Sequence, residues 1–182
     1  MNRFKFDEEK AVASLLYIAK KLGKDKADLH SVFKTLYFAE QKHLVRYGRP
    51  VTGEIYSALR DGPVPSALYD LCKDSRKLNI PYKNLFQLDG RWLITVLSDP
   101  NLDEFSESDL ECLDEAIKEI EGLSYNDRRG ISHDPAYTQA WIKKGSKKSQ
   151  VIDVIDIAIA GGADKEMIKF IKEELEFINA FC

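Results

Sequence analysis

The chain has 182 residues and a formal net charge of −3 at pH 7, with 44% hydrophobic and 31% charged residues. This size and balance are typical of a globular protein with one domain, or of one domain with an appendage. Because the charge is slightly negative, no global basic field attracts nucleic acid or anionic lipid, and we expect neither as a partner. No run approaches the ~20 apolar residues that a membrane span needs, and the N-terminal stretch has no apolar signal core.

The three cysteines, Cys72, Cys112 and Cys182, lie far apart and form no Cys-x-x-Cys pair. An odd and scattered set fits reduced thiols better than a disulfide framework. Together with the missing signal core, this pattern predicts a cytoplasmic protein.

Two helices are predicted near the N-terminus. Asp7 is a helix cap by residue type, and the helix that follows it ends at Gly23. The stretch 28–47 has apolar residues at steps of three and four and an unbroken apolar run in its middle. A helix that is apolar over most of its circumference is usually central in its fold. The short predicted loop at 24–26 places the first helix antiparallel to the central one or steeply across it.

A proline-containing turn region follows the central helix. Gly48 and Pro50 supply a helix stop, since glycine tolerates a left-handed backbone and proline cannot continue the helix. We interpret residues 51–60 as an irregular connector with a short extended piece. The sequence Gly62-Pro63-Val64-Pro65 is rigid, because each proline disfavours helical geometry in the residue before it. A short helix is predicted at 66–76.

The second half of the chain begins with a predicted antiparallel hairpin. Apolar residues at 86–88 and 91–96 flank Asp89-Gly90, which indicates a two-residue turn with positive φ at both central positions. Ser106, with Asp109 three residues later, then predicts the capped start of a further helix that Gly122 ends.

The C-terminal part is predicted to be helical. A short helix is expected at 123–129, and another opens at Asp134 or Pro135 and runs through Trp141. A basic loop at 143–148 marks the expected edge of the core domain. Residues 151–160 fit a helix or a strand, whereas 163–181 form an amphipathic helix.

These elements predict a mainly α fold: a compact helical domain around a central helix, with a small antiparallel β-hairpin. We expect two parts, a core domain at 1–148 and a C-terminal helical extension at 149–182 that packs on it. The extension is either a partner-specific element or a covering helix.

The residues show no legible active site. Neither the spacing of the three histidines nor any Ser-His, Cys-His or phosphate-loop pattern indicates a metal, a cofactor or a nucleophile. We interpret His30 as a surface or capping residue and His43 as a hydrogen-bonded core residue. His133 beside Asp134 fits either a base oriented by a carboxylate, as in a small hydrolase, or a capping element packed near Trp141. We favour the capping element, and therefore an interaction module without catalytic residues.

The stretch LYFAEQKHLVRYGRPVTGEIYSALRDGPVPSALY resembles the signature of the Panacea domain, a family of SocA-like antitoxins. That family has a Leu-Tyr-Phe-Ala helix, a Gly-x-Pro turn and a segment that ends in Gly-Pro-Val-x-Pro before another helix. This chain lacks the intervening residue, because Pro65 follows Val64 directly. The matching residues are Leu36, Tyr37, Phe38, Ala39, His43, Leu44, Gly48, Pro50, Ala58, Gly62, Pro63 and Val64. A second match lies at Ser132-His133 with Trp141.

The resemblance implies an antitoxin of a bacterial or phage type II toxin–antitoxin system, which neutralises its toxin by direct binding. The partner is then a toxin protein encoded by the adjacent gene. The resemblance also allows a proteolytic adaptor that delivers the toxin to a protease, and it assigns the histidine near the tryptophan a structural role. A homodimer is a further possibility.

The expected contact residues are aromatic and arginine side chains near the proline-containing turn, namely Tyr56, Arg60 and Tyr69. The alternative is that they pack the connector against the central helix. Residues 99–121 contain ten acidic residues and one basic residue. This charge either forms a solvated helix face or steers a basic toxin toward the chain.

Overall fold

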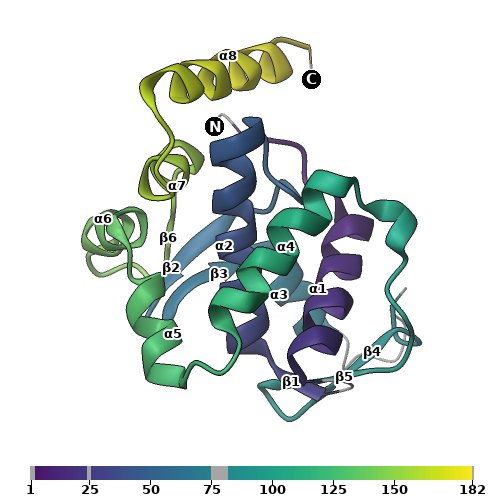
Figure 1. Ribbon diagram of the computed structural model, residues 1–182. Coiled ribbons are helices and arrows are strands. Elements are labelled where there is room, and N and C mark those ends of the chain that lie inside the picture. Colours follow the sequence, from purple (N-terminus) through teal and green to yellow (C-terminus); the bar gives the residue numbers. More distant parts are fainter. Residues whose placement is uncertain (1–2, 24–25, 75–81, 182) are drawn as a thin grey trace.

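The computed structural model describes residues 3–23, 26–74 and 82–181 and is mainly helical, with two small antiparallel sheets (Figure 1). The predicted fold class is thereby confirmed. The helices are α1 (Glu8–Gly23), α2 (Leu29–Tyr47), α3 (Ser66–Asp74), the 3-10 turn η1 (Leu102–Glu104), α4 (Glu107–Ile120), α5 (Tyr125–Ser132), α6 (Pro135–Lys144), α7 (Val154–Ala160) and α8 (Lys165–Phe181). The strands are β1 (Lys26–Asp28), β2 (Tyr56–Leu59), β3 (Gly62–Pro65), β4 (Phe86–Asp89), β5 (Leu93–Val96) and β6 (Gln150–Val151).

Helix α2 is central, as the sequence predicts, and packs against α1, α4, α5, α7 and β3 (Figure 1). It begins after Asp28, whose carboxylate accepts a hydrogen bond from the backbone N–H of Ser31 at 2.8 Å. It ends at Gly48, which has φ 68° and donates its N–H to the carbonyl of Leu44. A Cβ at Gly48 would lie 2.4 Å from the ring of Phe170 in α8, so both the backbone and the space require glycine here.

The first sheet has the strand order β1-β5-β4 and contains the predicted hairpin of β4 and β5. The predicted two-residue turn is wrong, because Asp89 pairs with Leu93 and leaves a three-residue loop. Gly90, the first residue of this loop, has a positive φ of 63°. The backbone carbonyl of Trp92 instead accepts the N–H of Leu29 at 2.7 Å, outside the hairpin. Strand β1 begins at Lys26, where the sequence predicted only a loop.

The second sheet has the order β3-β2-β6 and includes the proline-containing segment. The predicted connector at 51–60 holds β2, so its short extended piece is confirmed, whereas its pairing with β3 was not foreseen. Pro63 and Pro65 are tolerated because β3 lies at the edge of the sheet, where a missing N–H costs little. Strand β6 pairs with the other side of β2.

The C-terminal segment resolves into a strand and two helices. Residues 151–160, open between helix and strand in the sequence, contain the end of β6 and then α7, which Asp153 caps. The amphipathic helix expected at 163–181 is α8, which lies beside α7 at one end of the molecule (Figure 1). The predicted end of the 66–76 helix falls outside the described residues, as does Cys182.

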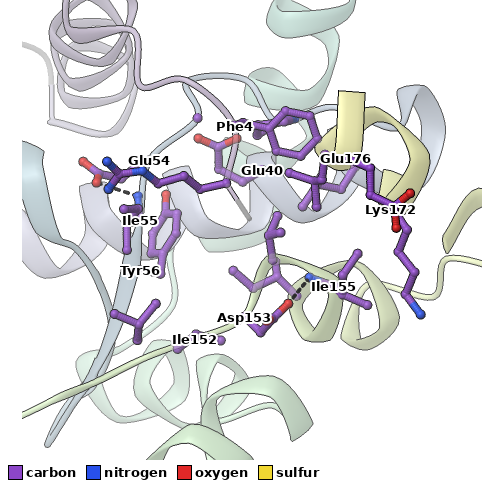
Figure 2. Close-up of a pocket in the computed structure, with 18 residues that line it drawn as sticks. Phe4, Glu40, Glu54, Ile55, Tyr56, Ile152, Asp153, Ile155, Lys172 and Glu176 are labelled. Atoms are coloured by element: carbon purple, nitrogen blue, oxygen red, sulfur yellow. Dashed lines mark hydrogen bonds between the residues drawn. The ribbon is translucent and has the colours of Figure 1, made fainter. Parts of the chain in front are cut away.

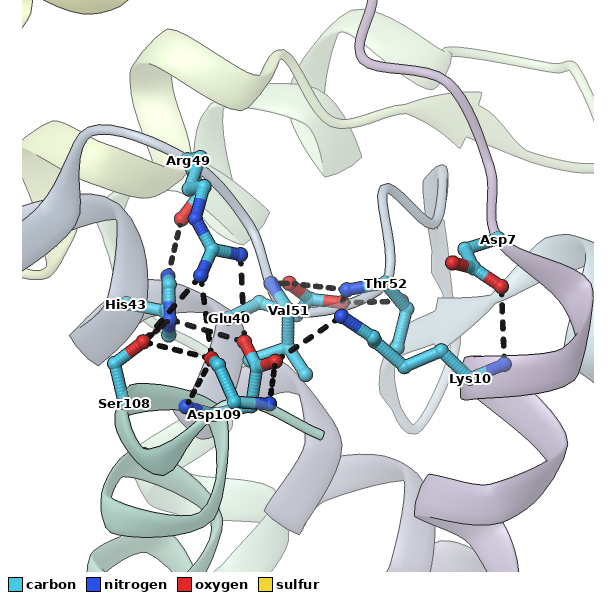
Figure 3. Close-up of polar contacts among 10 residues, drawn as sticks. Asp7, Lys10, Glu40, His43, Arg49, Val51, Thr52, Ser108 and Asp109 are labelled. Carbon is cyan, nitrogen blue, oxygen red and sulfur yellow. Dashed lines mark hydrogen bonds and ion pairs between the residues drawn. The ribbon is translucent and has the colours of Figure 1, made fainter. Parts of the chain in front are cut away.

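A buried carboxylate at the start of α4 joins three helices (Figure 3). Asp109 is 0% exposed. Its oxygens lie 3.0 Å from Lys10 Nζ of α1, and 3.1 Å from His43 Nε2 of α2. Burial acts to raise the pKa of Asp109, but the hydrogen bonds from His43, Ser106 and Lys10 outweigh it and hold the pKa well below its usual range. The predicted Ser106–Asp109 cap and the hydrogen-bonded core role of His43 are both confirmed.

We expect Asp109→Asn to lower the free energy of unfolding by about 3–5 kcal/mol, because it leaves charged and polar partners buried without their carboxylate. Urea denaturation measures this loss. Glu107→Gln, on an exposed side chain of the same helical turn, is the matched control and should change stability by less than ~0.5 kcal/mol. Equal effects of the two substitutions would contradict a joining role for Asp109.

Candidate functional site

The most prominent concave surface is a groove of about 750 Å³ between the β2–β3 hairpin, the first turns of α2, and helices α3, α5 and α6. We call it the hairpin groove. It is lined by Asp28, His30, Phe33, Lys34, Leu59, Arg60, Asp61, Val64, Tyr69, Trp92, Tyr125, Arg128, Trp141, Lys144 and Lys148. These residues come from distant parts of the chain, so the fold alone assembles them.

Positive charge gathers in the hairpin groove. Its lining includes five lysine and arginine side chains against two aspartates, although the whole chain has a net charge of −3. Arg128 is already paired with Asp28 at 3.3 Å. Within the described part of the chain, Arg60 and Lys148 have no ion-pair partner, so their charges face the groove unneutralised.

Aromatic rings line the same groove and are open to solvent. Trp92 is 56% exposed, Tyr125 45% and Trp141 36%. Trp141 ends a column of rings in which His133 stacks on Tyr137, and Tyr137 stacks on Trp141 at a centroid distance of 5.9 Å. The chain has two tryptophans, and both lie in this groove.

A buried lysine lies at the floor of the groove. Lys34 is 1% exposed, and its Nζ donates to the carbonyl of Pro63 at 2.8 Å. Gly62, at φ 109°, makes room for it, since a Cβ there would come within 2.9 Å of Lys34 Nζ. Burial lowers the pKa of Lys34 to about 7, against the opposing effect of Asp61. An ammonium group has three donors, so the Pro63 carbonyl uses one and leaves capacity for another acceptor.

The structure corrects the interpretation of His30 as a surface or capping residue. Asp28 caps α2, whereas the His30 ring is half-buried and packs against Tyr125 at a centroid distance of 4.3 Å, with the two rings tilted by 35°. Its Nε2 lies 3.2 Å from the carbonyl oxygen of Asp61, and its Nδ1 is buried without a hydrogen-bond partner in the described residues. Burial lowers the pKa of His30 to about 4, so the ring is neutral at pH 7.

Of the three predicted contact residues, two line the hairpin groove and the third is buried. Arg60 and Tyr69 both line the hairpin groove. Tyr56 is 1% exposed and packs against Tyr37 at a centroid distance of 5.1 Å, which is the packing alternative. Tyr56 therefore does not belong to the accessible surface. Among the residues expected to be structural, Trp141 also lines the groove.

His133 and Asp134 do not form the arrangement that a hydrolase would need. Asp134 caps α6, and its carboxylate accepts hydrogen bonds from Tyr37 Oη at 2.8 Å and from Gln41 Nε2 at 2.7 Å. The His133 ring instead stacks on Tyr137 at 4.1 Å, and no hydrogen bond joins it to Asp134 in the described structure. The geometry is that of the capping and packing alternative.

The acidic stretch 99–121 is partly paired within the fold. Glu111 and Glu115 of α4 bind Arg46 of α2 at 3.2 and 2.6 Å. Glu119 pairs with Lys42 at 2.9 Å, and Asp109 is buried. Asp103, Glu104, Glu107 and Glu121 form no ion pair among the described residues, so both expected roles of this charge, a solvated face and the steering of a basic partner, stay open.

A second, smaller pocket of about 290 Å³ lies between the end of α2, the start of β2 and the helices α7 and α8 (Figure 2). Glu40 lines it, with a fully buried carboxylate that accepts hydrogen bonds from the backbone N–H of Val51 and from the N–H and hydroxyl of Thr52 (Figure 3). Burial raises the pKa of Glu40 to about 7, although these hydrogen bonds oppose it. The carboxylate is thus committed to holding the turn after α2.

Within the described residues, no group of three or more His, Cys, Asp or Glu side chains is arranged to hold a metal ion. No helix of the described chain is both long and apolar enough to cross a bilayer.

The geometry is that of a mainly helical domain with an exposed groove rich in cations and aromatic rings. A family model described as antitoxin SocA-like, Panacea domain, matches residues 32–142. Since the match covers more than half of the chain, the chain belongs to this antitoxin family, which confirms the resemblance stated from the sequence. Comparisons with curated proteins and with solved structures gave no match.

The low pKa of Lys34 predicts a pH dependence of stability. The folded protein begins to lose this proton near pH 7, whereas the unfolded chain keeps it up to about 10.5. Unfolding therefore takes up a proton in this window, and stability should rise with pH. Relative to Lys34→Met, the wild-type protein should gain on the order of 2 kcal/mol between about pH 7 and 9, measured by urea unfolding. Parallel curves of unfolding free energy against pH for the two proteins would contradict a Lys34 pKa that is lowered by burial.

The raised pKa of Glu40 predicts the opposite slope. Above about pH 4.5 the unfolded chain loses a proton that the folded protein keeps up to about pH 7. The contribution is thus complete below pH 4.5 and is lost as the pH rises through 7. Compared with Glu40→Gln, the wild-type protein should lose on the order of 3 kcal/mol across this window. A Glu107→Gln control should show no such difference in slope.

Proposed function

We propose that this chain is the antitoxin of a type II toxin–antitoxin pair and neutralises a toxin encoded by the adjacent gene by binding it directly. Membership of the SocA-like antitoxin family is the observation that carries the proposal. The hairpin groove is the proposed contact surface. Interface hot spots are enriched in tryptophan, tyrosine and arginine, and Trp92, Tyr125 and Arg60 lie together there.

The groove is held rigid before any partner binds, which supports this choice. Tyr137 Oη donates to the carbonyl of Leu59 at 2.8 Å, and Arg129 Nη2 donates to the carbonyl of Arg60 at 3.3 Å. Lys34 holds the facing strand through Pro63. A surface whose backbone is already fixed loses less conformational entropy when it binds.

The charge of the groove indicates what the toxin presents to it. The acidic side chains of α4 are mostly paired within the fold, whereas Arg60 and Lys148 form no ion pair with any residue that the structure describes. Electrostatic complementarity then favours an acidic contact segment on the toxin, docked against cationic and aromatic side chains.

Coexpression with the adjacent gene tests the proposal. If the adjacent gene is toxic, the wild-type chain should restore growth and copurify with its product. Arg60→Glu and Trp92→Ala, both on exposed side chains, should weaken the complex by about tenfold or more, as expected for hot-spot residues. Lys118→Glu, on an exposed side chain of α4 outside the groove, is the charge-matched control and should bind like the wild type.

A toxic neighbour that this chain fails to neutralise would contradict the proposal. Neutralisation that survives both groove substitutions would leave the antitoxin function intact and move the contact surface elsewhere. The decay of the toxin after its synthesis is stopped separates two modes of action. A masked toxin persists in the complex, whereas a toxin delivered to a protease by an adaptor disappears.

We also propose the division into a core domain at 1–148 and an extension at 149–182, both acting in the cytoplasm. The family match ends at residue 142, just before the proposed boundary. The extension adds β6 to the second sheet and packs α7 on α2, which supports a covering role.

A further inference from the structure

We propose that the hairpin groove is also a binding site for a nucleotide, whose base stacks on the exposed Trp92 and whose phosphates bind the lysine and arginine side chains of the groove. This inference stands apart from toxin binding, because it concerns the chain alone. It rests on the size of the groove, on its charge and on its aromatic rings.

The size of the groove fits a small molecule. Its volume of about 750 Å³ lies within the ~300–1,000 Å³ that is typical of ligand pockets. The smaller pocket near Glu40 has about 290 Å³, and its buried carboxylate is already hydrogen-bonded to the 51–52 turn. The hairpin groove is therefore the better candidate of the two.

The cations of the groove suit a polyphosphate. Arg60 offers a planar guanidinium group for bidentate contacts, and Lys148 offers a mobile ammonium group. Lys34 adds a buried ammonium at the floor, where only the Pro63 carbonyl is bound among the described acceptors. An anionic oxygen at this point would give the buried charge a counter-charge that Pro63 does not supply.

The aromatic rings account for the base. Trp92 presents the most open ring of the groove, at 56% exposed, whereas Tyr137 stacks on Trp141 and Lys144 Nζ lies over the Trp141 ring at 4.7 Å from its centroid. Tyr125, 45% exposed, supplies a further ring. A simple anion would use the cations but would leave these rings open to water, whereas stacking on an aromatic side chain is worth ~1–3 kcal/mol per base.

A longer nucleic acid fits the molecule less well. Binding a strand needs a track of positive charge that follows many phosphates. Here the chain as a whole is acidic, and the excess of lysine and arginine is a property of the groove lining. The charge pattern thus favours a mononucleotide with a di- or triphosphate.

Tryptophan fluorescence provides a direct test, because both tryptophans line the groove. The purified full chain is titrated with ATP and with GTP, and binding is measured in parallel by calorimetry. We expect saturable quenching with at least one of them. Adenosine, guanosine and inorganic triphosphate should each bind at least about tenfold more weakly, since each lacks one half of the contacts.

Substitutions assign the two halves of the site. Arg60→Ala and Lys148→Ala should each weaken binding by about tenfold, in line with the loss of a charge-assisted hydrogen bond. Trp92→Ala should weaken nucleotide binding but not the binding of triphosphate. Lys143→Ala, an exposed cation of α6 that does not line the groove, is the matched control and should have no effect. Circular dichroism and an unfolding curve establish that each variant is folded.

Several outcomes would overturn the inference. They are the absence of binding at millimolar ATP and GTP, an equal effect of Lys143→Ala, and inorganic triphosphate that binds as tightly as the nucleotides. A single-stranded RNA that binds the groove more tightly than any nucleotide would also reassign the site. None of these results depends on whether the adjacent gene encodes a toxin, so the two proposals fail separately.

Discussion

The fold depends on three buried polar side chains of one helix, each of which has a partner outside that helix. Lys34, Glu40 and His43 are all buried on α2. Lys34 binds strand β3 through Pro63, Glu40 binds the turn at 51–52, and His43 contacts Asp109 of α4. A buried polar group without a hydrogen bond costs ~1–3 kcal/mol or more, so these contacts fix three segments around α2 as firmly as apolar packing does.

Local signals in the sequence predict most of the helices. Asp7, Asp28, Ser106 and Asp134 cap helices at or next to the positions that the sequence indicates, because a cap is a contact over three residues. Strands β1, β3 and β6 have no comparable local signal, since they are short and their pairing depends on distant partners. The turn after Asp89 also depends on a distant partner, because the carbonyl of Trp92 accepts a hydrogen bond from the N–H of Leu29 at the start of α2.

The candidate site was only partly predictable. Residue type alone points to Arg60 and Tyr69, and both line the groove. The sequence alone does not predict that Lys34, Trp92 and Lys148 lie in one groove, because the fold brings them together from distant parts of the chain. One signal for Lys34 was present: it is a lysine within a helix that is otherwise apolar over most of its circumference. Tyr56 is buried, although the sequence points to it as a contact residue. Residue type alone does not distinguish an aromatic side chain in the core from one on the surface beside a turn.

The position of β6 has a consequence for the integrity of the second sheet. Strand β2 lies between β3 and β6, so its backbone groups are covered on both sides. Because β6 comes from Gln150–Val151, a chain cut before this point would leave one side of β2 with unpaired N–H and carbonyl groups. Such an open edge is a template for strand exchange and aggregation between copies. The C-terminal segment thus serves as a built-in safeguard against self-association, whatever its role toward other proteins.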